Sequence, residues 1–166
     1  MPVQTFDSPI GPLYVIADGD RISRFSFGPA SEPDDPSDLT WKTEAWTRAY
    51  FEGGADPYEL PLASIDSPFQ AKVRTAMLSI PFGQTRTYGD IAKDIYGNPR
   101  AVGQACGRNP IPLIVPCHRV LAAGGSLGGF SGGDGLPTKK KLLAHEARFA
   151  FGQRRRFKQN VGCRTY

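Results

Sequence analysis

The sequence predicts an α+β fold, in which a small N-terminal domain built on an antiparallel sheet precedes a mostly helical C-terminal domain. Three observations indicate this fold: apolar residues alternate up to Phe27, helix-start signals recur from Ser67 onward, and 166 residues suffice for a small domain joined to a larger one. We therefore expect an N-terminal domain at residues 1–66, a second domain at residues 67–150 and a basic C-terminal tail at residues 151–166.

Residues 3–27 have the pattern of β-strands. Apolar and polar residues alternate in segments 13–17 and 21–27, and Asp18-Gly19-Asp20 between them is typical of a turn. Gly11-Pro12 marks an earlier turn. After a loop rich in Pro, Asp and Ser, residues 41–51 are expected to form a helix, which ends at Gly53-Gly54. Its apolar positions at helical spacing are Trp41, Ala45, Trp46 and Ala49.

The second domain begins with a strong helix start at Ser67. Ser67 can cap the helix, Pro68 suits its first turn, and Gln70 can close a capping box. The apolar stripe of this helix is formed by Phe69, Val73, Met77 and Ile80, and the helix ends at Pro81-Phe82-Gly83. Residues 55–66 are the extended connection that leads to it.

Residues 87–106 have the pattern of a helix-turn-helix. Thr87-Tyr88-Gly89-Asp90 is a second capping signature, residues 96–99 form a turn, and a short helix runs from Arg100 to Cys106. The second helix carries Arg100 near its start and small residues along it: Ala101, Gly103 and Ala105. Small residues allow close approach to a nucleic-acid groove, but they equally allow tight packing inside a protein.

Beyond this pair, the chain is rich in turns. Residues 109–112 form a stiff link, Leu113-Ile114-Val115 is expected to be a short buried strand, and residues 122–135 contain seven glycines. The last helix is expected at Leu136 to Ala147, and the basic tail around Arg154–Lys158 is expected to be loose.

Charge is distributed unevenly along the chain. Residues 1–66 hold four basic and twelve acidic residues, a net charge of −8, whereas residues 67–166 hold sixteen and four, a net charge of +12. This asymmetry indicates that the second part faces a polyanion such as DNA, although a basic solvated surface without a partner explains it equally well.

Several classes of protein are disfavoured. The three cysteines are odd in number and match no disulfide framework, and neither a C-x-x-C nor an H-x-x-x-H spacing supports a structural zinc site. No apolar run reaches the ~18 residues that a membrane span needs, and the N-terminus lacks the features of a signal peptide. We expect a cytoplasmic protein without a bound metal.

Cys117 is the candidate nucleophile. A thiol reacts as thiolate, so it needs a base, and His118 is the next residue. Neighbours in an extended segment point to opposite faces, so the pair needs a bridging water or an irregular turn. We expect Glu146 to accept the other ring N–H of His118 and Arg119 to add positive charge nearby. Taken singly, each residue is more often inert: a buried cysteine, a core histidine, an exposed helix carboxylate.

These residues resemble a known family. Asn109-Pro110 followed by Pro116-Cys117-His118-Arg119-Val120 is similar to the active-site signature of the O6-alkylguanine-DNA alkyltransferases. The resemblance covers roughly residues 5–149, and its further matching segments are Ser8–Leu13, Tyr88, Arg100–Gly103, Phe130–Gly133 and Leu142–Glu146.

The resemblance implies a fold and a mechanism. The N-terminal domain would be ribonuclease H-like, and the C-terminal domain would bind damaged double-stranded DNA through the minor groove and flip the alkylated guanine out of the stack. Cys117 would then take the alkyl group irreversibly, once per molecule and without a cofactor. We expect a monomer with no membrane partner.

The resemblance also implies residue roles. Arg100 would fill the space left by the flipped base, and Tyr88 would press on a phosphate and give a proton to the guanine. The remaining contacts to DNA would come from Ala101, Gly103, Ala105 and Arg119. The backbone N–H groups of Cys117 and Ser131 would hold the O6 atom, while the carbonyls of Cys117 and Val120 would accept the exocyclic amine. The pocket would be lined by Val120, Phe130, Ser131 and Gly132, and Asn109 would brace the turn before it.

The chain departs from the family pattern in four places. The connection from Tyr88 to Arg100 is about two residues shorter, the loop from Gly133 to Leu142 is about two residues longer, Phe130 stands where Tyr is frequent, and Cys106 stands where a larger apolar residue is common. Three other functions stay open: a module that binds alkylated bases without repair, a methylation sensor that regulates transcription, and a thiol hydrolase. The retained Cys117 argues against the binding module, and the lack of the expected regulatory domain argues against the sensor. The adjacent Cys–His spacing argues against the hydrolase.

Overall fold

The N-terminal part of the protein is a three-stranded antiparallel sheet covered by one helix. In this computed structural model, which describes the backbone of residues 1–161 and the side chains of residues 1–150, strands β1 (Val3–Phe6), β2 (Leu13–Asp18) and β3 (Arg21–Phe27) lie in the order β1-β2-β3. The predicted alternation is confirmed, since Leu13, Val15 and Ala17 are fully buried while the residues between them are half-exposed.

Helix α1 (Asp38–Phe51) packs on this sheet with a different face from the one predicted. Ser37 caps it, and the buried residues are Thr40, Thr43, Trp46, Thr47 and Tyr50. Trp41, which the sequence assigned to the apolar face, is 63% exposed. The threonines can be buried because their hydroxyls donate to carbonyls of the preceding turn, as Thr47 does to Thr43 at 2.8 Å.

The connection after α1 contains a short 3-10 turn, η1 (Pro57–Glu59), and leads to α2 (Pro68–Leu78). Ser67 caps α2 as predicted, by accepting from the backbone N–H of Gln70 at 3.3 Å. The expected capping box does not form, because the Gln70 side chain instead donates to the Ala105 carbonyl at 2.7 Å. Gln70 therefore ties α2 to the helix that contains Ala105.

The predicted helix-turn-helix is present as α3 (Tyr88–Asp94) and α4 (Pro99–Gly107). Thr87 and Asp90 form a capping box at the start of α3, and the Asn98 side chain accepts from the N–H of Ala101 at the start of α4. The short turn between them puts Tyr96 in the left-handed region, at φ +56°, with its side chain 98% exposed.

The segment before Cys117 is a tight turn, and the strand predicted at Leu113–Val115 is wrong. Pro112 and Val115 form an isolated bridge around a turn in which Leu113 has φ +73°. All three apolar residues are buried, so hydrophobicity alone could not distinguish this turn from a strand. A 3-10 turn, η2 (Cys117–Arg119), follows and leads into β5 (Val120–Leu121), which pairs in parallel with β4 (Arg86–Thr87). A last 3-10 turn, η3 (Ala123–Gly125), follows β5.

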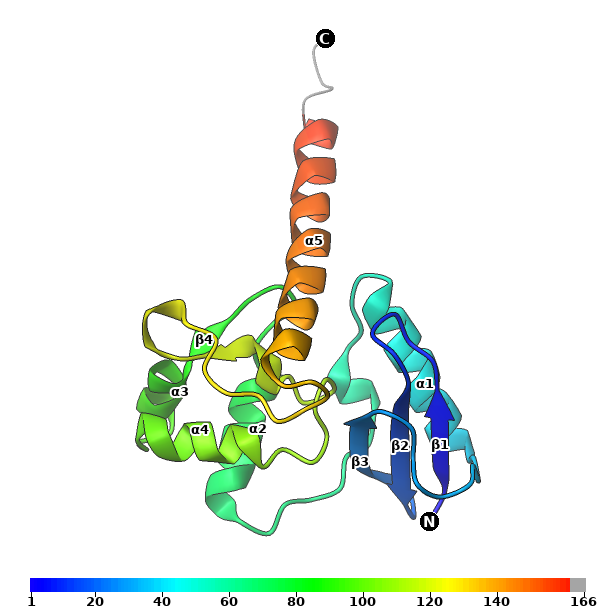
Figure 1. Ribbon diagram of the computed structural model, residues 1–166. Coiled ribbons are helices and arrows are strands. Elements are labelled where there is room, and N and C mark those ends of the chain that lie inside the picture. Colours follow the sequence, from blue (N-terminus) through cyan, green and yellow to red (C-terminus); the bar gives the residue numbers. More distant parts are fainter. Residues whose placement is uncertain (162–166) are drawn as a thin grey trace.

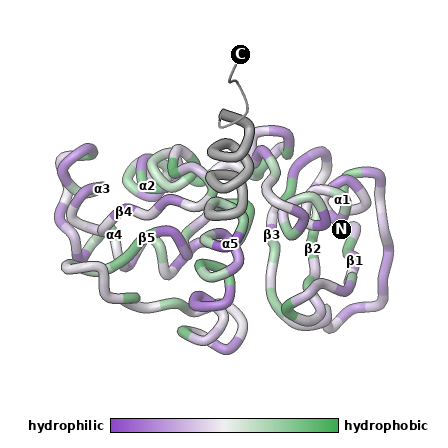
Figure 2. The backbone as a smooth tube through the Cα atoms, turned by 90° about the horizontal axis from the view of Figure 1, so that it is seen from above, coloured by the Kyte–Doolittle hydropathy of each residue, from purple (hydrophilic) through white to green (hydrophobic). Residues whose placement is uncertain are grey.

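Helix α5 (Leu136–Val161) lies between the sheet and the helices α2 to α4, as Figures 1 and 2 show, and its C-terminal part projects beyond them. It is longer than the predicted Leu136–Ala147, and residues 154–158, expected to be loose, continue its backbone. The remainder of the predicted basic tail, residues 162–166, lies outside the described residues.

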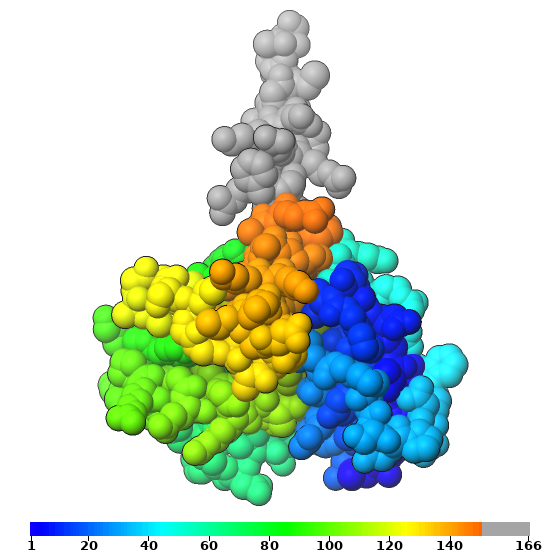
Figure 3. Space-filling model, viewed as in Figure 1, coloured from blue at the N-terminus to red at the C-terminus, as the bar shows by residue number. Residues whose placement is uncertain are grey.

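One hydrophobic core joins the two parts of the chain. It includes Phe25 and Tyr50 from the N-terminal part together with Ile91, Ile111 and Leu142 from the rest. Figure 3 shows the two parts packed side by side, with the start of α5 against both. The backbone N–H of Phe25 donates to the Pro110 carbonyl at 3.1 Å, which links β3 directly to the segment before Cys117. In the described part of the chain, no helix combines the length and the apolar character that crossing a membrane requires.

The Tyr96 turn gives a first prediction. A left-handed conformation costs a non-glycine residue ~1–2 kcal/mol, and the exposed Tyr96 side chain offers no burial to offset it. Tyr96→Gly should therefore be more stable than Tyr96→Ala by ~1 kcal/mol in denaturant unfolding, the entropy of glycine reducing the full difference. Equal stability of the two variants would show that the turn is not strained at this position.

Candidate active site

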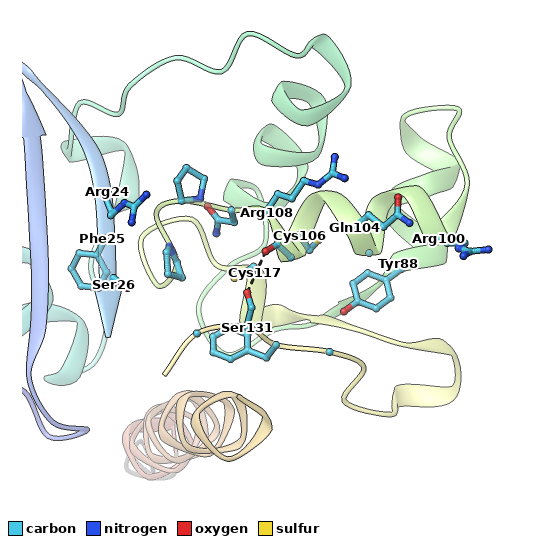
Figure 4. A pocket seen from close by; sticks show the side chains of 18 residues that line it. Arg24, Phe25, Ser26, Tyr88, Arg100, Gln104, Cys106, Arg108, Cys117 and Ser131 are labelled. Atoms are coloured by element: carbon cyan, nitrogen blue, oxygen red, sulfur yellow. Dashed lines mark hydrogen bonds between the residues drawn. The ribbon is translucent and has the colours of Figure 1, made fainter. Parts of the chain in front are cut away.

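Cys117 lies at the wall of the main pocket. The residue is 8% exposed and lies on the 3-10 turn η2, where the pocket of about 780 Å³ opens between α4, the glycine-rich loop and β3. Figure 4 shows Cys117, Cys106 and Ser131 on one side of this pocket and Tyr88 beside them. The irregular turn that the sequence required between Cys117 and His118 is thus present.

The resting thiol is protonated. Burial raises the pKa of Cys117, and the nearby Asn109 amide, the Lys139 ammonium and backbone N–H groups oppose this shift without cancelling it. A protonated thiol is a poor nucleophile, so reaction at neutral pH requires a group that removes its proton. That group must lie close to Cys117 and be neutral itself.

His118 meets this requirement. It is fully buried, and burial lowers its pKa even though Glu146 pulls in the other direction, so the imidazole is neutral at pH 7. Its Nε2 donates to Glu146 Oε2, which confirms the predicted contact. Its other nitrogen, Nδ1, is buried and has no hydrogen-bond partner among the described residues. The ring is therefore oriented with a free acceptor.

Glu146 is the most heavily bonded side chain of the site. Besides His118, its carboxylate accepts from the Tyr50 hydroxyl at 2.6 Å, from Arg119 Nε at 2.7 Å and from the Gly83 N–H at 3.0 Å. Burial raises its pKa, but the hydrogen bonds and the charge of Arg119 outweigh this and hold the pKa at about 2. Glu146 is thus an anion that can stabilise a proton on His118.

Tyr88 begins α3 and forms another wall of the pocket. Its ring packs between two glycines, because a Cβ added to Gly128 would lie 2.9 Å from the Tyr88 hydroxyl and one added to Gly103 would lie 3.9 Å from the ring. Burial raises the pKa of Tyr88, so its hydroxyl keeps its proton and can donate it. The Lys139 ammonium lies 5.9 Å from the centre of the ring.

The residues predicted on the second helix divide into two groups. Arg100 is exposed and extends away from Cys117, on the far side of Tyr88 (Figure 4), and Ala101 and Gly103 are half-exposed. Ala105, which was also predicted to face DNA, is buried in the core, so that prediction is wrong. Ala105 is buried because this part of α4 packs on α2, where the Gln70 side chain donates to the Ala105 carbonyl at 2.7 Å.

Arg119 was predicted to contact DNA, and this prediction is wrong as well. The side chain is only 6% exposed, donates to Glu146 and to the Ile80 carbonyl at 2.7 Å each, and lies over the Phe82 ring. Its charge therefore neutralises the buried carboxylate of Glu146. Sequence position next to His118 suggested proximity to the site, but it could not show which direction the guanidinium takes.

The predicted pocket residues are brought together only in part. Phe130, Ser131 and Gly132 line the pocket, and Phe130 packs edge-on against Phe27 at 6.1 Å. Val120 does not line it: the side chain is buried, and its carbonyl accepts from Lys139 Nζ at 2.7 Å. The backbone N–H of Cys117 donates to the Val115 carbonyl at 2.8 Å, so it is not free to hold a substrate oxygen as expected.

Asn109 braces the turn before Cys117, as predicted. Its side-chain nitrogen donates to the Val115 carbonyl at 2.9 Å, and its oxygen accepts from the Ile111 N–H at 3.1 Å. These two bonds span the left-handed turn at Leu113 and fix the path of the chain into Cys117. An aspartate in this position would lose the donor, and an alanine would lose both bonds.

Lys139 is the main site residue that the sequence analysis missed. It falls within the predicted last helix, but no role was predicted for it. Lys139 is fully buried and donates to the carbonyls of Val120, Leu127 and Gly129 at 2.7, 2.5 and 3.2 Å. The ammonium thereby holds the glycine-rich loop against β5. A signal was available, because Lys139, Leu142 and Glu146 have the i, i+3, i+7 spacing of one helix face.

The N-terminal part also reaches the site, which the sequence did not indicate. Arg24, Phe25 and Ser26 of β3 line the pocket, and Tyr50 of α1 contacts Glu146. Within the described residues, no group of three or more His, Cys, Asp or Glu side chains is arranged to hold a metal ion.

The buried pair predicts an acid-sensitive fold. A group whose pKa is lower in the folded than in the unfolded protein loses its stabilising contribution as the pH falls. The free energy of unfolding should first decrease below the ordinary His pKa of 6.5, because His118 resists protonation in the folded protein. It should then decrease by on the order of 3 kcal/mol between pH 4.5 and 2, because Glu146 stays ionised in the folded protein.

Denaturant unfolding across this pH range measures the effect. Glu146→Gln should be less stable at pH 7, because the amide cannot accept all four bonds, but its stability should change less between pH 4.5 and 2. A parallel decline in both proteins would mean that Glu146 is not the titrating group.

Comparison with known proteins identifies relatives. Residues 68–148 match the family described as 6-O-methylguanine DNA methyltransferase, DNA binding domain. The methylated-DNA–protein-cysteine methyltransferase of Methanosarcina acetivorans is 41% identical over 151 residues, which span 85% of this chain and 95% of the relative. The protein of the same name from Mycobacterium bovis is 39% identical and spans 86% and 90%.

Solved structures agree with these relatives. Mycobacterium tuberculosis OGT in complex with DNA superposes with a TM-score of 0.78 at 37% identity, over 90% of this chain and 94% of that one. The O6-methylguanine-DNA methyltransferase of Pyrococcus kodakaraensis gives a TM-score of 0.68 at 28% identity, over 87% and 98%. Identity near 40% along almost the full length of both chains means that this chain belongs to the methylated-DNA–protein-cysteine methyltransferase family, whose members repair DNA by moving an alkyl group to a cysteine.

Proposed function

We propose that Cys117 is the cysteine that accepts the alkyl group from O6-alkylguanine in DNA. The observation that carries this assignment is the arrangement of a pocket-lining thiol beside a neutral, buried histidine whose second nitrogen is held by a buried carboxylate. Burial raises the pKa of both Cys106 and Cys117, so the pKa does not separate them. Cys106 also lines the pocket, but its thiol contacts Met77 Sδ at 3.6 Å, whereas Cys117 is adjacent to His118 on the same turn. Cys117 is the better acceptor of the two.

The reaction starts with removal of the thiol proton. His118 Nδ1 is neutral and unpartnered among the described residues, so it accepts this proton through a bridging water, and Glu146 stabilises the imidazolium through Nε2. The thiolate then attacks the alkyl carbon and displaces the O6 oxygen of guanine. A carbon–sulfur bond forms as the carbon–oxygen bond breaks.

The leaving guanine must gain a proton. Tyr88 lines the pocket with a protonated hydroxyl, and it donates to the guanine ring as the negative charge develops. The proton held by His118 restores Tyr88 through solvent, so the thiol proton ends on guanine. The backbone N–H of Ser131 supports the O6 atom. The thioether is stable, so each molecule reacts once, and no cofactor takes part in these steps.

Helix α4 is the element that would bring the alkylated base to the pocket. Arg100 is exposed at the first turn of this helix, beyond Tyr88. Ala101 and Gly103 are half-exposed, and their small size leaves the helix surface beside Arg100 free of long side chains. We assign the minor groove as the surface that α4 enters, with Arg100 replacing the flipped base and the protein acting as a monomer. Flipping is required because Cys117 lies within the pocket, out of reach of a base in a duplex.

The division of the chain is part of this proposal. Residues 67–150 carry the nucleophile, its base and the helix-turn-helix, and the family match to residues 68–148 supports a boundary near Ser67. Residues 1–66 form the sheet domain, and residues 151–166 form a basic C-terminal segment. We assign a cytoplasmic location, which suits a DNA substrate and the free thiols of Cys106 and Cys117.

Mass spectrometry tests the acceptor. After incubation with a duplex that carries O6-methylguanine, the intact protein should gain one methyl group, ~14 Da, and peptide mapping should locate it on Cys117. Cys117→Ala should gain nothing, whereas Cys106→Ala should still be methylated. An unchanged wild-type mass, or a methyl group on Cys106, would refute the assignment.

Arg100 can be tested by comparing two substrates. Arg100→Ala should slow transfer from duplex DNA by about a hundredfold, since it removes the side chain that compensates unstacking, a cost of a few kcal/mol. Transfer from free O6-benzylguanine should change much less, because no base has to be flipped. Arg21→Ala, which removes an exposed arginine of β3, is the charge-matched control. Equal losses on both substrates would exclude the base-replacing role.

A further inference from the structure

We propose that Tyr50 is a positioning residue for the alkyl transfer, which holds Glu146 and thereby the proton-accepting His118 from the other part of the chain. The inference rests on the proposed role of Cys117. It makes α1 a contributor to the reaction through Glu146 and His118.

The contact that carries this inference is buried and specific. Tyr50 is in the last turn of α1, and its hydroxyl donates to Glu146 Oε2 at 2.6 Å across a sequence separation of 96 residues. The same carboxylate oxygen accepts from His118 Nε2, whereas Arg119 and Gly83 bond the other oxygen. Tyr50 and His118 therefore share one acceptor atom.

The Tyr50 ring cannot move away from this oxygen. Trp46 stacks on it with ring centres 5.9 Å apart, and Phe51 and Phe82 meet it edge-on at 5.0 and 5.5 Å. His145 adds a tilted contact at 5.4 Å, and Tyr50 meets His118 edge-on at 6.4 Å. A hydroxyl fixed in this way defines where Oε2 lies, and Oε2 in turn defines the plane and tautomer of the His118 ring.

Sharing one oxygen has an electrostatic consequence. A donated hydrogen bond withdraws charge from Oε2, so less negative charge is available to stabilise a proton on His118. Removing the hydroxyl should strengthen the attraction between Glu146 and an imidazolium and raise the pKa of His118. The other titratable or charged groups around this pair are Cys117, Arg119, Lys139 and His145, and none of them changes when Tyr50 loses only its oxygen.

Tyr50 could instead act only by packing, which is the ordinary role of a core tyrosine. The two roles differ in what the oxygen does. Tyr50→Phe keeps the ring and deletes the hydrogen bond, whereas Trp46→Phe keeps the hydroxyl and weakens the stack. A packing role predicts an effect from the second change, and a positioning role predicts a distinct pH effect from the first alone.

The experiment is a pH titration of the full chain by two readouts. NMR follows the ring protons of His118, which are readily assigned because the chain has only two histidines, and methyl transfer from an O6-methylguanine duplex is timed at each pH. In Tyr50→Phe, the midpoint of the His118 titration should move up by about half to one pH unit, and so should the acid limb of the pH–rate profile. The rate of methyl transfer on the plateau of this profile should fall several-fold.

Controls separate the possible results. Trp46→Phe and Tyr58→Phe, the latter at a tyrosine that is 67% exposed, should leave the His118 midpoint unchanged. An unchanged midpoint in Tyr50→Phe, with or without a uniform loss of rate, overturns the inference. A wild-type protein that transfers no methyl group refutes the proposed function instead, and the NMR midpoint still decides whether Tyr50 acts on His118.

Discussion

The site depends on the buried carboxylate of Glu146. A carboxylate removed from water is strongly destabilising unless donors surround it. Here four donors from three segments converge on it: Tyr50 from α1, Gly83 from the segment after α2, and His118 and Arg119 from η2. Each donor is therefore held where the carboxylate needs it. The requirement to satisfy one charge joins α1, the segment after α2, the η2 turn with Cys117 and α5 into one structure.

A second buried charge organises the opposite side of the pocket. The Lys139 ammonium has three protons, and three carbonyls of β5 and the glycine-rich loop accept them. Glu146 and Lys139 lie on one face of α5, two turns apart, so a single helix presents an anion to the histidine and a cation to the loop. This pairing lets a flexible, glycine-rich segment form a defined pocket wall, and it also explains why burial of Lys139 is compatible with a stable fold.

Much of the local structure could be predicted because it depends on neighbours in the sequence. The caps at Ser67 and Thr87, the alternation in β2 and the two helices of the helix-turn-helix all follow from short-range hydrogen bonding and periodicity. The failures have a common cause. Burial of the threonine face of α1 and of the turn at Leu113 depends on what these segments pack against in the tertiary structure. Burial of Arg119 and Lys139 depends on polar partners 27 and 19 residues away, Glu146 and the Val120 carbonyl. No local pattern reveals whether such a partner exists.

The sequence by itself indicated the family and singled out Cys117, His118 and Glu146 as the candidate nucleophile, its base and the partner of that base, because Cys117 and His118 are adjacent and Glu146 follows on a predictable helix. It also placed Arg100 in the first turn of the second helix of the pair. Only the tertiary structure decided the charge states, since these depend on burial and on donors from Tyr50 and Arg119 that lie 96 and 27 residues from Glu146. It also decided which cations face solvent. Arg100 and Arg119 look alike in sequence, but one extends into solvent and the other neutralises a buried anion, because desolvation penalises an unpaired charge and not a paired one.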